Sequence, residues 1–526
     1  MTLPVAKPTP ARFPLMLSAA LVPLAVLVTS TAHADLTDLI NAGQLAGYNE
    51  IRFQSAVATQ AVYDQLKTAG CDDAQTGPTA KCGNGAYLVW RNVREVVHNA
   101  NYWSNQLNAN GVQKPTTFTL GRTVAQLGGA LQWCNGEEFA SLNSLSTSFI
   151  SAQTSSLAAR VTALRFGASG FHAANVSLND DESLAYDIAP RGGGASADDD
   201  SDDDYDSAHS PWSVWGIFGN GSYIKGEKAP TGSEEGFDYK GPSFNIGVDH
   251  RVSQHWVLGA MTGYQKQSLD FTPFLNNLAV GGSDMSGFSV QPYALYESDH
   301  WYLNLSLGYQ NIKFDTNRIV NYGTQAGTIL PVTITVAHNT TDDSAAHAGS
   351  LSSYDTLGFS IRPVAAWSIE PSLSLDYQHL HIGQFTENDL NNQGFAFTVD
   401  GQTINSIEGI PELRMQYTFT PHFGVWTPYV DVQWHHQFNT SPRTVNAIYA
   451  DAQNLLTPAA SFTIKTDELD PWYQVYAAGI AAVIRGSSAG ETHSSGGLQL
   501  YANYRRYEGL RNYKQQIYAA GLRYEF

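Results

Sequence analysis

The chain has 526 residues, of which only 15% are charged while 12% are aromatic, including 27 Tyr and 11 Trp. Its formal net charge of -19 argues against nucleic acid as a partner, because phosphate binding needs a basic patch and none appears. Outside the N-terminus the chain also lacks the runs of about 18 apolar residues that identify helical membrane proteins.

The first 34 residues have the three parts of a secretory signal. Lys7 and Arg12 precede an apolar run at 15–28, and Ala-His-Ala at 32–34 forms a small-x-small cleavage site. We therefore expect the mature chain to begin near Asp35. A retained membrane anchor is the weaker alternative, because the run is short for a bilayer span.

Residues 35–174 are expected to form a small, mainly helical domain. Two stretches of it carry apolar residues at helical spacing: Trp90, Val93, Val97 and Ala100, and further on Leu157, Val161 and Leu164. Spacings of three, four and seven residues place such side chains on one face of a helix. We assign both faces to the core of this domain.

The three cysteines all belong to this region. Export permits a disulfide, and Cys71 and Cys82, which enclose a stretch with Gly, Pro and Thr, are the expected pair, leaving Cys134 over. The alternative is three unpaired buried thiols. Nearby, Glu137 and Glu138 are expected to flank a helix, with one Glu exposed to solvent.

The composition changes completely at 175–210, which carries a Gly triplet and seven Asp between 198 and 206. With almost nothing to bury, this segment is expected to be a solvated linker. Clustered carboxylates also suit calcium, but the Gly turn and the bidentate Glu of an EF-hand loop are missing.

Alternating strands fill the remainder, 211–526. In 301–310, for example, the odd positions are aromatic or aliphatic and most even positions are polar or small. The predicted strands begin near residues 212, 236, 255, 286, 300, 348, 371, 405, 423, 471, 497 and 513. An even count with no leftover edge is what a closed, membrane-spanning β-barrel needs, so we predict an all-β antiparallel barrel of twelve strands.

Short turns and long polar loops alternate along these strands, as expected when the two rims face different compartments. The long loops lie near 271–285, 317–346, 387–404 and 440–470, and the stretch 486–496 breaks the rule. On the last strand the even positions from Tyr518 to Phe526 are apolar and suit lipid, while the odd positions suit a polar interior. Charged residues expected to face that interior, where they can pair across the pore, are Arg414, Asp431, Arg505, Arg523 and Glu525.

These stretches resemble the C-terminal translocator domain of classical autotransporters, the type V secretion proteins of Gram-negative outer membranes. The likeness rests on 287–296 with the following Trp301-Tyr302, on 500–504, and on the final 521–526. Gly521, Tyr524 and Phe526 match the family's Gly-x-x-aromatic-x-aromatic assembly signal, although Ala519 stands where the family has a polar residue. The resemblance implies an outer-membrane location, the barrel-assembly machinery and periplasmic chaperones as partners, and export of the N-terminal domain to the cell surface.

No pattern for catalysis, a cofactor or a metal emerges. The Gly-Asp-Ser-Leu block of esterase passengers is absent, and Gly167–Gly170 is one residue short of Gly-x-Ser-x-Gly. His435 and His436 are neighbours on a strand and face opposite sides, His435 inward and His436 outward, so they cannot chelate one metal in the usual way.

We therefore expect a non-enzymatic barrel that anchors and translocates the helical domain, with the linker passing through the pore. The domain is expected to be retained, because no autoproteolytic Asn pair is evident. Two alternatives stay open: an outer-membrane channel whose helical domain acts as a periplasmic plug, and a surface adhesin or hydrolase with an unrecognised passenger.

Overall fold

The computed structural model describes residues 36–108, 118–165 and 214–525, apart from 254, 275–277, 299, 323–337, 365, 422–423 and 486–497. The expected signal peptide, the linker 175–210 and Phe526 therefore lie outside the described residues.

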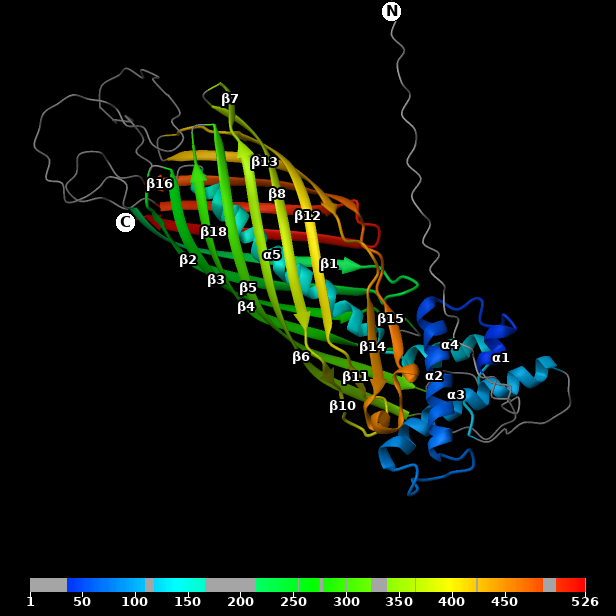
Figure 1. Ribbon diagram of the computed structural model, residues 1–526. Coiled ribbons are helices and arrows are strands. Elements are labelled where there is room, and N and C mark those ends of the chain that lie inside the picture. Colours follow the sequence, from blue (N-terminus) through cyan, green and yellow to red (C-terminus); the bar gives the residue numbers. More distant parts are fainter. Residues whose placement is uncertain are drawn as a thin grey trace, which may run out of the picture.

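Twelve antiparallel strands close into a barrel, as the sequence predicted (Figure 1). Closure is made by β1 and β18, which pair from Gly216–Glu525 to Lys228–Tyr513. The wall strands are β1 (Val214–Lys228), β2 (Phe237–Arg251), β3 (Trp256–Phe271), β4 (Gly281–Glu297), β5 (Trp301–Tyr322), β6 (His338–Phe359), β8 (Trp367–Ile382), β12 (Gln402–Tyr417), β13 (Val425–Gln437), β16 (Trp472–Arg485), β17 (Leu498–Glu508) and β18 (Tyr513–Glu525).

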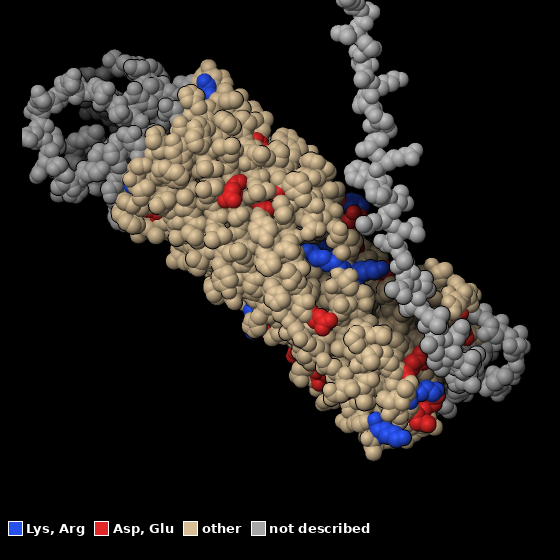
Figure 2. Space-filling view, in the orientation of Figure 1, with Lys and Arg blue, Asp and Glu red and all other residues tan. Residues whose placement is uncertain are grey.

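Side chains alternate between the two faces of this wall. In β18, Tyr518 and Leu522 are 48% and 51% exposed on the outside, whereas Ile517 and Arg523 are buried inside. An apolar outer face and a polar inner face are typical of transmembrane barrels. Figure 2 shows the result, since most of the barrel wall in that view carries no charged side chain.

The two rims of the barrel differ. One carries the short turns, including the small strand β7 (Ile361–Val364), together with the start of β1 and the end of β18. The other carries the long connections, and there the expectation of plain polar loops is wrong. β9 (Phe385–Thr386), β11 (Phe397–Val399), β14 (Thr444–Tyr449) and β15 (Phe462–Lys465) form a separate four-stranded sheet, and β10 (Asn388–Asp389) extends β6. Their apolar side chains, such as Phe397 and Phe462, are buried.

The helices fall into two groups (Figure 1). Outside the barrel, at the long-loop rim, lie α1 (Leu36–Asn41), α2 (Glu50–Ala69), α3 (Asn84–Asn108), α4 (Val124–Trp133) and the 3-10 turn η1 (Glu137–Ala140), beside η3 (Ala450–Leu455) and η4 (Pro458–Ala460) from the loops. Thr123 starts α4 with a capping box, and Gly70 ends α2 at φ 110°. No helix among the described residues is both long and apolar enough to cross a membrane.

The remaining helix, α5 (Ser141–Ala163), runs inside the barrel. The helical spacing predicted that its apolar face belongs to the core of the helical domain. In the structure Leu157, Val161 and Leu164 instead pack against wall residues such as Phe218 and Met261. The described element that fills the pore is therefore α5, which lies upstream of the expected linker.

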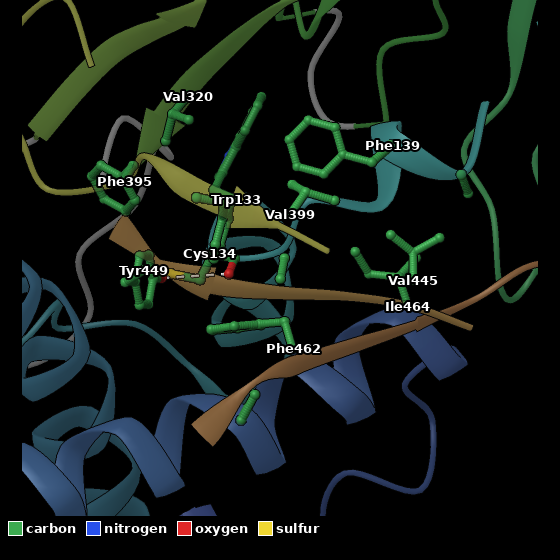
Figure 3. Packing of buried hydrophobic residues seen from close by; sticks show 14 of the residues in the cluster. Trp133, Cys134, Phe139, Val320, Phe395, Val399, Val445, Tyr449, Phe462 and Ile464 are labelled. Atoms are coloured by element: carbon green, nitrogen blue, oxygen red, sulfur yellow. Dashed lines mark hydrogen bonds between the residues drawn. The ribbon is translucent and has the colours of Figure 1, made fainter. Parts of the chain in front are cut away.

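A single apolar core joins the helices α1–α4 to the four-stranded sheet, which we call the loop sheet, and to the ends of the wall strands at the long-loop rim. Figure 3 shows where they meet: Trp133, Cys134 and Phe139 from the helical segment lie among Val399, Tyr449 and Phe462 of the sheet and Val320 of β5. We call α1–α4, η1 and the four-stranded sheet together the cap. The cap is one folded unit built from two distant parts of the chain.

Candidate functional site: the occupied pore and its cap

The middle of α5 is held in the pore by uncharged polar contacts. The Gln153 amide donates to Ser243 Oγ at 3.0 Å and to Gln265 Oε1 at 3.2 Å, and its oxygen accepts from Ser289 Oγ at 3.0 Å. One buried glutamine thus bridges β2, β3 and β4. Buried polar side chains are tolerated because their hydrogen bonds are made.

Near its C-terminal end α5 carries charges that match the wall. Arg160 donates to Asp249 on β2, which also accepts from Arg523 at 2.8 Å and from Tyr293 Oη at 3.2 Å. All four side chains are buried. Asp249 thereby links the pore helix to the closing strand β18, and it pairs with two buried guanidinium groups at once.

Just beyond α5, Arg165 forms a bidentate pair with Glu370 of β8, with N–O distances of 2.8 and 3.0 Å. Its guanidinium also lies over the Tyr302 ring, 3.4 Å from the centroid. Charge-assisted, two-pronged contacts of this kind are the strongest and most directional that arginine makes. They place the end of the helix at the short-turn rim.

The charged residues predicted to face the interior can now be located. Arg414, Asp431, Arg505 and Arg523 are buried inside the barrel, whereas the side chain of Glu525 is not described. Arg414 donates to Thr162 Oγ1 of α5 at 2.6 Å and to Glu412 at 2.8 Å, with Asp431 at 3.5 Å. Arg505 donates to Ser155 Oγ at 3.4 Å. Arg414 and Arg505 thus contact the helix, and Arg414 also pairs with Asp431.

His435 and His436 lie on opposite faces of β13. His435 points inward, where its Nδ1 lies 2.9 Å from Glu408 Oε2, and Tyr473 Oη donates to the same oxygen at 2.9 Å. His436 is outside and stacks on Trp472. A cavity of about 30 Å³ beside α5 is lined by His435, Glu408 and their neighbours, room for roughly one water. Among the described residues no cluster of His, Cys, Asp or Glu has metal-binding geometry.

The helical part of the cap is bonded to the barrel loops at several points. Asn92 of α3 donates to the Gln393 carbonyl at 2.7 Å, and Arg91 donates to the same carbonyl at 3.0 Å. Gln65 of α2 accepts from the Thr457 amide at 2.7 Å. Because these contacts join residues some 300 or more positions apart in the chain, they hold the helices to the loops directly.

Two glycines permit close approach across this contact. A Cβ on Gly85 of α3 would lie 2.9 Å from the Asp451 carbonyl oxygen, and one on Gly394 would lie 2.8 Å from the Leu88 backbone. Gly394 also has a φ of 79°, which favours glycine. The fit is too tight for any larger residue to be accommodated without movement.

Glu137 and Glu138 do not flank a helix in the way the sequence suggested. Both lie in η1, only 1% and 4% exposed, at the junction of cap and wall. Burial raises the pKa of Glu138 to about 8 and that of Glu235, in the β1–β2 connection, to about 7; burial and then Glu138 raise the pKa of Glu137. Gln132 of α4 donates to Glu235. No local sequence pattern marks these acids as buried.

The cysteines and the assembly residues complete the set. Cys71 and Cys82 form a disulfide with a Cα–Cα distance of 5.0 Å, while Cys134 is free and its burial raises the pKa of the thiol to about 12. On β18, Tyr524 is exposed on the outer face. Gly521 lies under the Tyr501 ring, where a Cβ would come within 2.5 Å of Tyr501 Oη.

The family model of the autotransporter β-domain matches residues 217–505. The solved translocator domain of autotransporter NalP from Neisseria meningitidis is 12% identical, with a TM-score of 0.42, covering 60% of this chain and 88% of that one. The β-domain of the Bordetella autotransporter BrkA is 17% identical, with a TM-score of 0.38, covering 60% of this chain and 100% of that one. The transport unit of the autotransporter AIDA-I from Escherichia coli is 15% identical, with a TM-score of 0.36, covering 61% of this chain and 93% of that one. No curated protein sequence matches the chain.

Proposed function

Since the chain belongs to the autotransporter family, whose barrel sits in the outer membrane and anchors and translocates an N-terminal domain, we propose that here the domain stays on the barrel after export as a fixed cap. The observation that carries the proposal is the single core shared by α2, α3, α4 and the loop sheet. A domain made to leave would not bury its apolar side chains against the barrel's own loops.

On this proposal, export ends in a locked state. α5 remains in the pore, held by Gln153, Arg160 and Arg165, and the cap closes the long-loop rim. We propose matching domain boundaries. Residues 36–140 supply the helical half of the cap, α5 is the pore helix, and 211–526 form the barrel together with the loop sheet. The function is anchoring and closure, and we propose no catalytic role.

Assembly is proposed to use the barrel-assembly machinery and periplasmic chaperones, with Gly521, Tyr524 and Phe526 as the signal. The terminal strand suits such a reader, because strand addition works through exposed backbone groups. The sequence of the first 34 residues supports export.

Cysteine labelling of intact cells tests the proposal. Thr68→Cys places a thiol on the exposed end of α2, and Val252→Cys places one at the short-turn rim. A membrane-impermeant maleimide should label the first variant on intact cells, and the second only after permeabilisation. The unaltered chain, whose free Cys134 is buried, provides the background.

The same gel also reports retention. Label from Thr68→Cys should migrate with the full mature chain, because the cap is not released. Label on a small fragment would contradict a fixed cap, and labelling of Thr68→Cys only after permeabilisation would favour a periplasmic plug instead.

A further inference from the structure

The outer wall is ordered in rings near the cap. On six strands an exposed or partly exposed aromatic residue is followed, two to four positions nearer the cap, by a basic one: Tyr223 and Lys225, Phe244 and Lys240, Tyr264 and Lys266, Tyr309 and Lys313, Tyr504 and Arg506, Tyr518 and Lys514. Aromatic rings mark the level of the lipid headgroups in membrane proteins. The basic ring therefore lies at or just beyond the headgroups on the cap side.

This basic ring covers only one side of the barrel. It occupies β17, β18, β1, β2, β3 and β5, whereas β6, β8 and β13 contain no Lys or Arg and the single arginine of β12, Arg414, points inward. At the corresponding level these strands carry histidines, such as His347 and His381. The asymmetry distinguishes the ring from an even distribution of solubilising charge.

Lys225 and Lys240 form its centre. They are directly opposite each other in the β1–β2 register, and both side chains are exposed on the outer face. Like charges facing each other across two strands are destabilising. Lys266 and Lys313 lie near Asp284 and Asp315, but neither Lys225 nor Lys240 has an ion pair within the part of the chain that the structure describes.

An acidic pair limits what can bind. Glu227 and Asp238 face each other one step closer to the cap, on the same face of the same strands. Glu227 is paired with Lys514 of β18 at 2.5 Å, so Asp238 is the carboxylate that would repel an anion moving further outward from the two lysines. The anion would therefore rest at the lysine level, with apolar chains below it against Tyr223 and Phe244, which are exposed.

From this arrangement we infer that the β1–β2 face at Lys225 and Lys240 binds a phosphate group of an acylated glycolipid in the outer leaflet. The lysines supply the positive charge, and the aromatic ring supplies the surface for the acyl chains. The assignment to the outer leaflet rests on the cap facing outward, but the binding chemistry does not.

Binding can be measured on the purified full-length protein in detergent by native mass spectrometry, with bisphosphorylated lipid A as the probe. We expect retained lipid, and we expect Lys225→Gln/Lys240→Gln to lose roughly 30-fold in affinity, since each basic residue near an anionic lipid surface contributes about fivefold. The control, Lys81→Gln/Lys465→Gln, makes the same charge change in the cap and should bind as the parent does.

Two further probes identify the ligand on the unaltered protein, so that a folding defect in the variant cannot obscure the result. Dephosphorylated lipid A should bind weakly. Binding equal to that of bisphosphorylated lipid A would overturn the claim that the site recognises a phosphate group. Phosphatidylglycerol should also bind weakly. Binding equal to that of bisphosphorylated lipid A would overturn the claim that the ligand is a glycolipid. Undiminished binding by the double variant, with its fold verified by heat-modifiable migration on gels, would overturn the site itself.

Discussion

Arg165 and Glu370 join the end of the pore helix to the wall strand β8 through two parallel hydrogen bonds of 2.8 and 3.0 Å. Both side chains are almost fully buried, 4% and 3% exposed. Two charges taken out of water in this way depend on each other, because the only other carboxylate paired with Arg165 among the described residues, Glu297, lies farther away at 3.7 Å.

Glu370→Gln should therefore loosen the end of α5. Breaking a buried pair by removing one partner typically costs about 3–5 kcal/mol. We expect higher ion conductance of the purified protein in planar bilayers, because the helix no longer seals the short-turn rim. The double variant Arg165→Gln/Glu370→Gln should recover part of the closure. A single variant as closed as the parent would show that this pair does not hold the helix.

Gly85→Ala should weaken the attachment of the cap. The added methyl group would lie 2.9 Å from the Asp451 carbonyl oxygen, so α3 and η3 would have to separate, at about 1–3 kcal/mol for such overpacking. Faster cleavage of the cap by added protease is the expected result. The matched control is Gly83→Ala, whose methyl group meets nothing within 4 Å; equal cleavage of both variants would count against a tight contact at Gly85.

Gly521→Ala should impair the folded barrel through Tyr501. A methyl group there would come within 2.5 Å of the Tyr501 hydroxyl oxygen, forcing this buried side chain to move. We expect a smaller fraction of compact, heat-modifiable protein on unboiled gels. Gly219→Ala, on the neighbouring strand β1, meets its nearest atom at 3.7 Å and should be tolerated. If both substitutions behave alike, close packing at Gly521 is not what the position requires.

The junction of cap and wall should weaken as the pH rises. The folded state raises the pKa of Glu138 from 4.5 to about 8, and that of Glu235 to about 7, because burial disfavours the ionised forms. Between about pH 4.5 and pH 8 the folded protein therefore binds more protons than the unfolded chain. The stability from the neutral carboxyls is complete below about pH 4.5 and is lost progressively toward pH 8.

Hydrogen exchange of α4 and η1, corrected for the intrinsic effect of pH, should therefore be faster at pH 8 than at pH 5. Glu138→Gln/Glu235→Gln should remove most of this difference, because an amide cannot ionise. Glu468→Gln, an exposed loop residue, should leave it unchanged. A double variant with the parent's pH dependence would place its origin elsewhere.

Much of the barrel could be predicted from the sequence, because alternation is a property of each strand alone. The strand that starts near 300 needs only its own residues to reveal a lipid face and an inner face. The place of α5 could not be predicted in the same way. Leu157 and Val161 show only that one helix face is apolar, and they do not show whether its partner is another helix or a barrel wall.

The polar residues of α5 held the missing signal. Gln153 and Arg160 lie on a helix that is buried nearly all round, which is unusual for a compact helical domain but natural in a pore lined with Asp249 and Gln265. The cap was harder still to foresee. Its core unites residues such as Trp133 and Phe462, and no short-range pattern connects positions so far apart.

The path of α5 separates two properties that are easily confused. Arg165 and the start of β1 lie at the same rim of the barrel, so both ends of the stretch that joins them lie on one side of the membrane. A protease that cut this stretch would divide the polypeptide in two. The cap helices and α5 would then belong to one piece and the loop sheet and barrel to the other, but the shared core and the contacts of α5 with the wall would still hold the two pieces together. For this protein, severing the chain and shedding the domain are different events.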